Sequence, residues 1–133
     1  MNTEVVEFLG QLPPVRAAEA RQLIDMGERI SGFPVRLAGR GILGFGRYDY
    51  RYASGHVGNA AVISFAPRKA ELVLYPSCAL EDAAEVLEQL GRYRRGKGCV
   101  YLRRLEDADP AAVEALFRRG VAEISALWPV TSQ

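Results

Sequence analysis

The sequence predicts an α+β domain in which helices pack on one face of an antiparallel sheet of four to five strands. Apolar residues recur at helical spacing near both ends of the chain, whereas the middle contains short extended segments joined by short links. The resulting order, α-α-β-β-β-α-β-α, is typical of an antiparallel sheet with its helices gathered on one side, and not of a doubly wound parallel sheet. All 133 residues are expected to form this one domain, because the chain is too short for a second core.

A pair of helices is expected at the start of the chain. Apolar side chains repeat at helical spacing within residues 5–12, and Pro13–Pro14 ends that helix and begins the next. In the second helix the apolar positions from Leu23 to Ile30 form a buried stripe. This helix is expected to end near Ser31–Gly32.

The middle of the chain is expected to be an antiparallel meander. The pattern becomes extended from Ile42, and within residues 47–52 tyrosines alternate with charged residues at period two. This alternation is typical of a strand with one covered face. The remaining segments are predicted to be a loop at 54–59, a strand at 61–65, a turn at 67–69 and a strand at 72–75.

The helical period returns in the last part of the chain. Apolar residues between 80 and 90 predict a helix that Gly91 ends in a left-handed conformation. A basic loop and a strand at 99–102 follow, and Asp109–Pro110 supplies an N-cap and a first-turn proline for the last helix.

Composition restricts the classes of function. Seventeen Lys and Arg balance sixteen Asp and Glu, so no global field is present that would gather nucleic acid or an anionic membrane. The N-terminus lacks the features of a signal peptide and the apolar runs are short, so we expect a cytoplasmic protein without a membrane segment. Cys78 and Cys99 are expected to be reduced thiols in that compartment.

Three ordered segments resemble the signature of the YdhG-like family of uncharacterised domains. They are Gly44–Gly55, then Ser64–Lys69 with Leu72–Tyr75, and Leu90–Leu102, and with the flanking helices the resemblance spans nearly the whole chain. It implies an α+β fold whose function is mostly unassigned, and some members carry a frataxin-like iron-chaperone label. The chain departs from the family pattern where tryptophans are usual, at Ala38 and Ala60. If those aromatic residues line a binding surface in relatives, this chain has lost part of it.

The run from Arg92 to Gly98 is the strongest local patch of charge. Arginines on a glycine-bearing loop can hold a phosphate or carboxylate by charge-assisted bonds, and Lys97 adds a point charge. The same cations also suit the negative end of the preceding helix. The candidates for binding an anion or a partner are Arg68, Lys69, Tyr93, Arg94, Arg95 and Lys97.

The tyrosine-rich strand offers a second candidate surface. Tyr48, Tyr50 and Tyr52 fall on one strand face, where they either pack beneath the helices or stack flat ligands on an open sheet. The opposite face, which includes Arg47, would then be solvated or would itself bind.

Metal and catalytic chemistry have weaker signals. Frataxin-like iron handling requires clustered carboxylates, and the nearest set is Glu81, Glu85 and Glu88, which a solvated helix surface explains equally well. The sequence contains no recognisable pair of a catalytic nucleophile and its base. The sequence therefore predicts a non-enzymatic binding module for an anionic small molecule or protein partner, with no resident cofactor. An iron chaperone is the alternative, and an enzyme of unknown class is the third hypothesis.

Overall fold

The computed structural model describes residues 1–132. Its helices are α1 (Thr3–Gly10), α2 (Pro14–Ser31), α3 (Ala84–Leu90) and α4 (Pro110–Leu127), with short 3-10 helices η1 (Leu80–Asp82) and η2 (Leu105–Asp107). Its strands are β1 (Val35–Gly39), β2 (Ile42–Phe45), β3 (Arg47–Arg51), β4 (Val57–Ala60), β5 (Ile63–Pro67), β6 (Leu72–Tyr75), β7 (Arg94–Arg95), β8 (Val100–Leu102) and β9 (Val130–Thr131).

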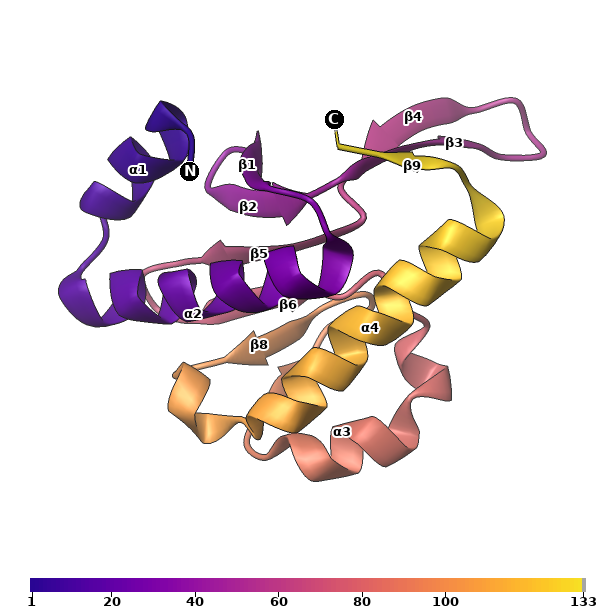
Figure 1. The fold of residues 1–133 in the computed structure, drawn as a ribbon. Helices are drawn as coiled ribbons and strands as arrows, with labels where there is room; N and C mark the ends of the chain where they lie inside the picture. Colours follow the sequence, from indigo (N-terminus) through magenta and orange to yellow (C-terminus); the bar gives the residue numbers. More distant parts are fainter. Residues whose placement is uncertain (133) are drawn as a thin grey trace.

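The predicted α+β class is confirmed, and the sheet is larger than expected. Six antiparallel strands follow the order β1-β2-β5-β6-β8-β7, and α2 and α4 lie across one face of them (Figure 1). A second, three-stranded sheet has the order β4-β3-β9. The prediction of four to five strands was therefore too low.

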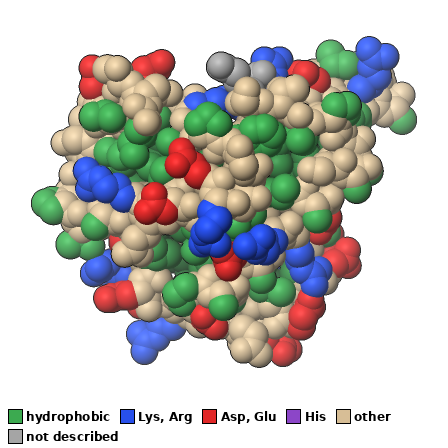
Figure 2. Space-filling view, in the orientation of Figure 1, with side chains coloured by type: hydrophobic (Ala, Val, Ile, Leu, Met, Phe, Trp, Pro, Cys, Tyr) green, Lys and Arg blue, Asp and Glu red, His purple; other side chains and the backbone are tan. Residues whose placement is uncertain are grey.

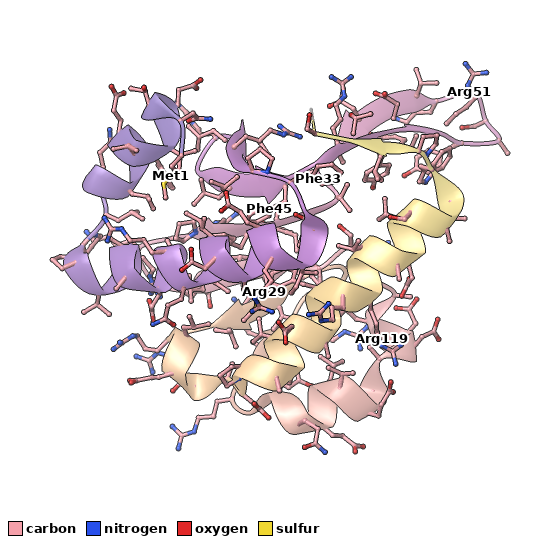
Figure 3. The ribbon with its side chains drawn as sticks, in the orientation of Figure 1. Met1, Arg29, Phe33, Phe45, Arg51 and Arg119 are labelled. Carbon is pink, nitrogen blue, oxygen red and sulfur yellow. The ribbon has the colours of Figure 1, made fainter. Side chains whose placement is uncertain are left out.

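The core lies between the six-stranded sheet and the helices. One row of paired residues, Leu43, Phe65, Leu74 and Val100, crosses four strands and is at most 1% exposed. Phe45 lies between the sheet and α2 (Figure 3), where an added Cβ on Gly27 would come within 2.3 Å of its ring. The helix and the strand therefore approach closely because α2 has a glycine at the crossing.

The opposite face of the sheet carries buried apolar residues such as Ala66 and Val73 at its centre, and Tyr101 and Arg94 toward the edge strand β7. Successive strand residues point to opposite faces, so the neighbours of the core row form a second row. Val73 pairs with Tyr101, which pairs in turn with Arg94. This second row positions the candidate site.

Glycines explain two differences from the predicted elements. The extended segment expected from Ile42 onward divides into β2 and β3 at Gly46, whose φ of 69° turns the chain into the second sheet. Gly91 has a positive φ of 111°, but its ψ of −135° is extended and not left-handed helical. Gly91 then bridges Ala108, where an added Cβ would lie 2.3 Å from the Asp107 carbonyl oxygen.

The helix predictions are confirmed at α1, α2 and α4, while the helix expected over 80–90 is interrupted. The α2 helix ends at Gly32 in the left-handed conformation. The Asp109 side chain accepts a hydrogen bond from the Ala111 amide at 3.0 Å and caps α4, with Pro110 in the first turn. Ala83, at φ −114° and ψ 29°, separates η1 from α3.

Candidate functional site

The predicted basic loop folds into a short hairpin that lines a cavity. Residues 94–95 form β7, which pairs with β8 at the edge of the large sheet. The cavity has a volume of about 620 Å³. We call it the arginine pocket, and it is lined by Glu71, Arg92, Tyr93, Arg94, Tyr101, Arg103, Arg104 and Asp107.

Arg94 is held in place by two contacts. Its guanidinium carbon lies 3.9 Å from the centre of the Tyr101 ring, and its Nη2 donates to Glu71 Oε1 at 2.8 Å. A hydrogen bond with Cys99 raises the pKa of Tyr101 above its ordinary value, so the phenol stays neutral at physiological pH. A neutral ring face over which a guanidinium stacks is a stable cation–π arrangement.

Arg92 and Arg103 are the cations of the pocket that remain available. Both are exposed, and neither side chain has an ion-pair or hydrogen-bond partner among residues 1–132. Their backbones are fixed, because the Arg92 amide donates to the Asp107 carbonyl at 3.2 Å and the Arg103 carbonyl accepts from Arg16 Nη2 at 3.1 Å. Two free guanidinium groups on an ordered frame suit a phosphate or carboxylate.

Arg104 is anchored on the side of the pocket nearest α2. Its Nε donates to Glu19 Oε2 at 3.0 Å, and its Nη1 lies 3.7 Å from Glu106 Oε1. The hydrogen bond to Glu19 raises the pKa of Arg104 above its ordinary value. The four arginines outnumber the two carboxylates, Glu71 and Asp107, so the lining has a net positive charge.

The other basic candidates lie outside this pocket. Arg95 pairs with Val100, so strand alternation points it to the other face of the sheet, 3.7 Å from Glu81. Lys97 is exposed in the turn between β7 and β8. Of the four candidates in the predicted basic loop, Tyr93 and Arg94 line the pocket, and Arg95 and Lys97 do not.

The turn between β5 and β6 contributes Glu71 to the pocket, whereas its two basic candidates, Arg68 and Lys69, do not line it. Arg68 Nη2 donates to the Tyr75 hydroxyl at 3.3 Å, and Tyr75 is close enough to Tyr101 to influence its ionisation. Arg68 therefore shares the sheet face with the pocket. Lys69 is exposed in the turn.

Sequence reasoning missed the second half of the site. Arg103 and Arg104 directly follow the predicted strand 99–102, but a loop at 92–98 gave no reason to bring them beside Arg94. The feature that could have indicated the site is the segment Arg94–Tyr101. It contains two glycines and is as typical of a tight hairpin as of a loop. That pairing places Tyr101 and Arg94 side by side.

The tyrosine row lies on a projecting hairpin and not beneath the helices. The hairpin formed by β3 and β4 extends from the body of the molecule, with Arg51 near its outer end (Figures 1 and 3). The centres of the Tyr50 and Tyr52 rings are 5.1 Å apart, and the Tyr52 and His56 rings stack at 5.9 Å. Tyr52 is 57% exposed.

This hairpin also corrects the loop predicted at 54–59. The expected loop at 54–59 contains the first part of β4, because Val57–Ala60 pair with β3. Tyr48 and Tyr50 are half-buried, and Arg47 on the opposite face pairs with Asp49 at 2.9 Å.

The acidic residues considered for iron do not form a cluster. The break at Ala83 places Glu81 on η1 and Glu85 on α3, and each pairs with an arginine, Arg95 and Arg119 respectively. Throughout residues 1–132, no group of three or more His, Cys, Asp or Glu side chains is placed to hold a metal ion.

Cys78 is a buried free thiol with an altered ionisation. Burial, followed by the nearby charge of Glu123, raises its pKa to about 11. Below pH 9, the ordinary pKa of a cysteine, Cys78 is protonated in both the folded and the unfolded chain. Between pH 9 and pH 11 the thiol ionises only in the unfolded chain. The contribution of Cys78 to stability is therefore present below pH 9 and lost as the pH rises toward 11.

We expect alkylation of Cys78 by iodoacetamide, followed by peptide mass spectrometry, to accelerate about tenfold per pH unit up to pH 11. A rate that levels off below pH 9.5, under conditions where the chain stays folded by circular dichroism, would contradict the raised pKa.

Charges of both signs are interspersed on the face shown in Figure 2, which agrees with the near-neutral net charge of +1. Within the part of the chain that the structure describes, no helix has both the length and the apolar character needed to cross a membrane.

Comparison of the chain with protein-family models, with curated proteins and with solved structures found no match.

Proposed function

We propose that this chain is a non-enzymatic binding module whose arginine pocket holds an anionic small molecule. The observation that carries the proposal is the presence of two unpaired guanidinium groups, Arg92 and Arg103, beside a cavity of about 620 Å³. A cavity of this size accommodates a small metabolite. We place this activity in the cytoplasm, as the sequence predicts.

The chemistry of the lining favours binding over catalysis. Arg94 is already committed to Glu71 and Tyr101, so it supplies positive charge from a fixed position. The neighbouring arginines are free to turn toward an incoming anion and to form two-pronged hydrogen bonds with it. The lining includes no serine, cysteine, lysine or histidine, and two of its possible bases, Glu71 and Tyr101, are already in contact with Arg94.

Substituting the two free arginines tests the proposal. We expect inorganic phosphate to bind the unaltered chain in isothermal titration calorimetry, and Arg92→Gln or Arg103→Gln to weaken it by about tenfold each. The double variant is expected to lose measurable binding. Both side chains are exposed, so the variants should keep the melting temperature of the parent chain.

Lys97→Gln is the matched control, because it removes the same charge from an exposed position outside the pocket. Equal weakening by Lys97→Gln and Arg103→Gln would mean that phosphate senses only net charge, and would overturn the assigned site. Thermal stabilisation by ferrous iron with none by phosphate or citrate would instead favour the iron-chaperone alternative.

Membership of the YdhG-like family remains a prediction from the sequence motifs.

A further inference from the structure

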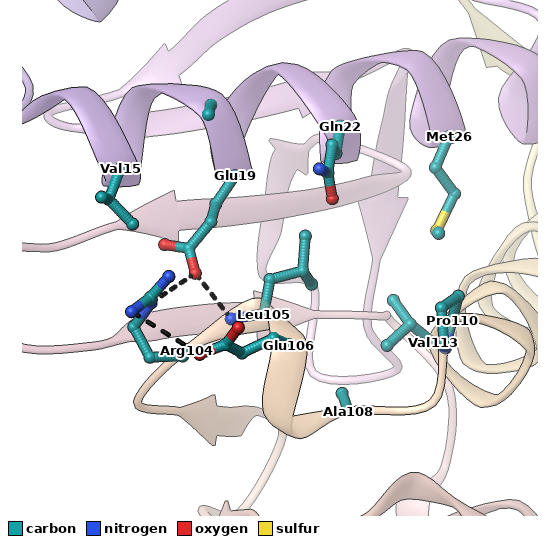
Figure 4. A pocket seen from close by; sticks show the side chains of 11 residues that line it. Val15, Glu19, Gln22, Met26, Arg104, Leu105, Glu106, Ala108, Pro110 and Val113 are labelled. Carbon is teal, nitrogen blue, oxygen red and sulfur yellow. Dashed lines mark hydrogen bonds and ion pairs between the residues drawn. The ribbon is translucent and has the colours of Figure 1, made fainter.

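A second cavity lies between α2 and the segment that joins β8 to α4 (Figure 4). Its volume is about 440 Å³. We call it the helix cavity, and it is lined by Val15, Ala18, Glu19, Gln22, Met26, Arg104, Leu105, Glu106, Ala108, Pro110 and Val113. Seven of these eleven residues are aliphatic or methionine, so most of the lining is apolar.

The buried carboxylate of the helix cavity already has its partners. Glu19 Oε1 accepts from Arg16 Nη1 at 2.6 Å, and Oε2 accepts from Arg104 and from the Leu105 amide at 2.7 Å. Figure 4 shows Glu19 directed toward Arg104 and Leu105. The carboxylate therefore has little remaining capacity to bind a ligand, and the cavity suits an apolar group.

One short segment separates the helix cavity from the arginine pocket. Arg103, Arg104 and Asp107 line the arginine pocket, while Arg104, Leu105 and Ala108 line the helix cavity. Arg104 belongs to both, and its side chain is 44% exposed at this boundary. The two cavities therefore meet at the side chain of Arg104.

We propose that the ligand is an amphiphile, with an anionic head in the arginine pocket and a straight apolar tail in the helix cavity. This inference rests on the proposed function and names its ligand class. The free guanidinium groups of Arg92 and Arg103 match the head, and the lining around Ala18 and Val113 matches the tail. A straight-chain carboxylate has this chemistry.

A chain-length series tests the inference. Dissociation constants of butanoate, hexanoate, octanoate and decanoate are measured by calorimetry below their micelle concentrations, with inorganic phosphate as the head-only reference. Each added methylene buried in the helix cavity is expected to tighten binding by about three- to fourfold. The gain should stop once the tail fills the cavity.

Ala18→Trp separates the tail from the head. Ala18 is exposed on α2, so a tryptophan there fills the helix cavity without entering the core. We expect this variant to bind phosphate normally and to lose the dependence on chain length. Ala122→Trp, an exposed position of α4 outside both cavities, should retain both properties.

The outcomes distinguish this inference from the proposed function. Phosphate binding that depends on Arg103, with no gain along the carboxylate series, would overturn the amphiphile and leave the anion site standing. Decanoate binding that Arg103→Gln leaves unchanged would show that the cavities do not share one ligand. Failure of phosphate and of every carboxylate to bind would overturn both proposals.

Discussion

Replacing Glu19 with alanine is expected to lower the free energy of unfolding by about 3–5 kcal/mol. Glu19 and Arg16 are charged residues of α2 that are only 6% and 7% exposed. Removing the carboxylate leaves the Arg16 guanidinium buried beside a single remaining partner, the Arg103 carbonyl. It also removes the acceptor of the Leu105 amide, so an uncompensated charge and an orphaned donor are created together.

Urea unfolding followed by circular dichroism measures this effect. Asp25→Ala is the matched control, because it removes a carboxylate from an exposed position of the same helix and should change stability by at most about 0.5 kcal/mol. The double variant Arg16→Met/Glu19→Leu removes both buried charges and should recover part of the loss. A cost below about 1 kcal/mol for Glu19→Ala would show that Arg16 finds solvent when its partner is removed.

The buried pair also explains how the candidate site keeps its shape. Glu19 bonds to Arg104 and to the Leu105 amide, and Arg16 bonds to the Arg103 carbonyl. These bonds tie α2 to the wall that separates the two cavities. The network is thus a tertiary link between the start of α2 and the end of β8, far apart in sequence.

Periodicity and capping residues were sufficient to predict α1, α2 and α4, but not the break at Ala83 before α3. The α2 helix ends at a glycine and α4 begins at Asp109–Pro110, and both signals act within one turn of the chain. The strand β1 (Val35–Gly39) was missed although its sequence alternates, because Pro34 and the glycines around it are typical of a turn. The segment forms a strand because it pairs with β2.

Only part of the candidate site could be predicted, because strand pairing again could not be foreseen from the sequence. The cluster of cations at 92–97 was visible in the sequence, but strand alternation decides which of them share a face. Arg94 faces Tyr101 and the pocket, whereas Arg95, one residue later, faces Glu81. Register cannot be read from composition, so Arg103 and Arg104 entered the site only once the β7–β8 pairing was known.

A methyl group at Gly120 is expected to destabilise the fold by about 3 kcal/mol or more, since forced overpacking reaches this range when backbone must move. An added Cβ there would lie 1.5 Å from the Pro76 carbonyl oxygen, where α4 crosses the segment after β6. That segment is itself constrained, because Ser77 has a positive φ of 64° and the Ala79 amide donates to Glu123 of α4 at 3.0 Å.

Two other helical glycines turn this prediction into a graded series measured by thermal unfolding. Gly27→Ala places its Cβ 2.3 Å from the ring of Phe45, a side chain that can shift, so the cost should be smaller than at Gly120. Gly10→Ala meets nothing within 4 Å and should stabilise α1 by up to about 1 kcal/mol, because alanine is the better helix former. Similar losses at all three positions would indicate a general effect of helix glycines. The expected order, with Gly120→Ala the most damaging, would instead locate the constraint at the crossing of α4 over Pro76, because only there does the added methyl group meet backbone.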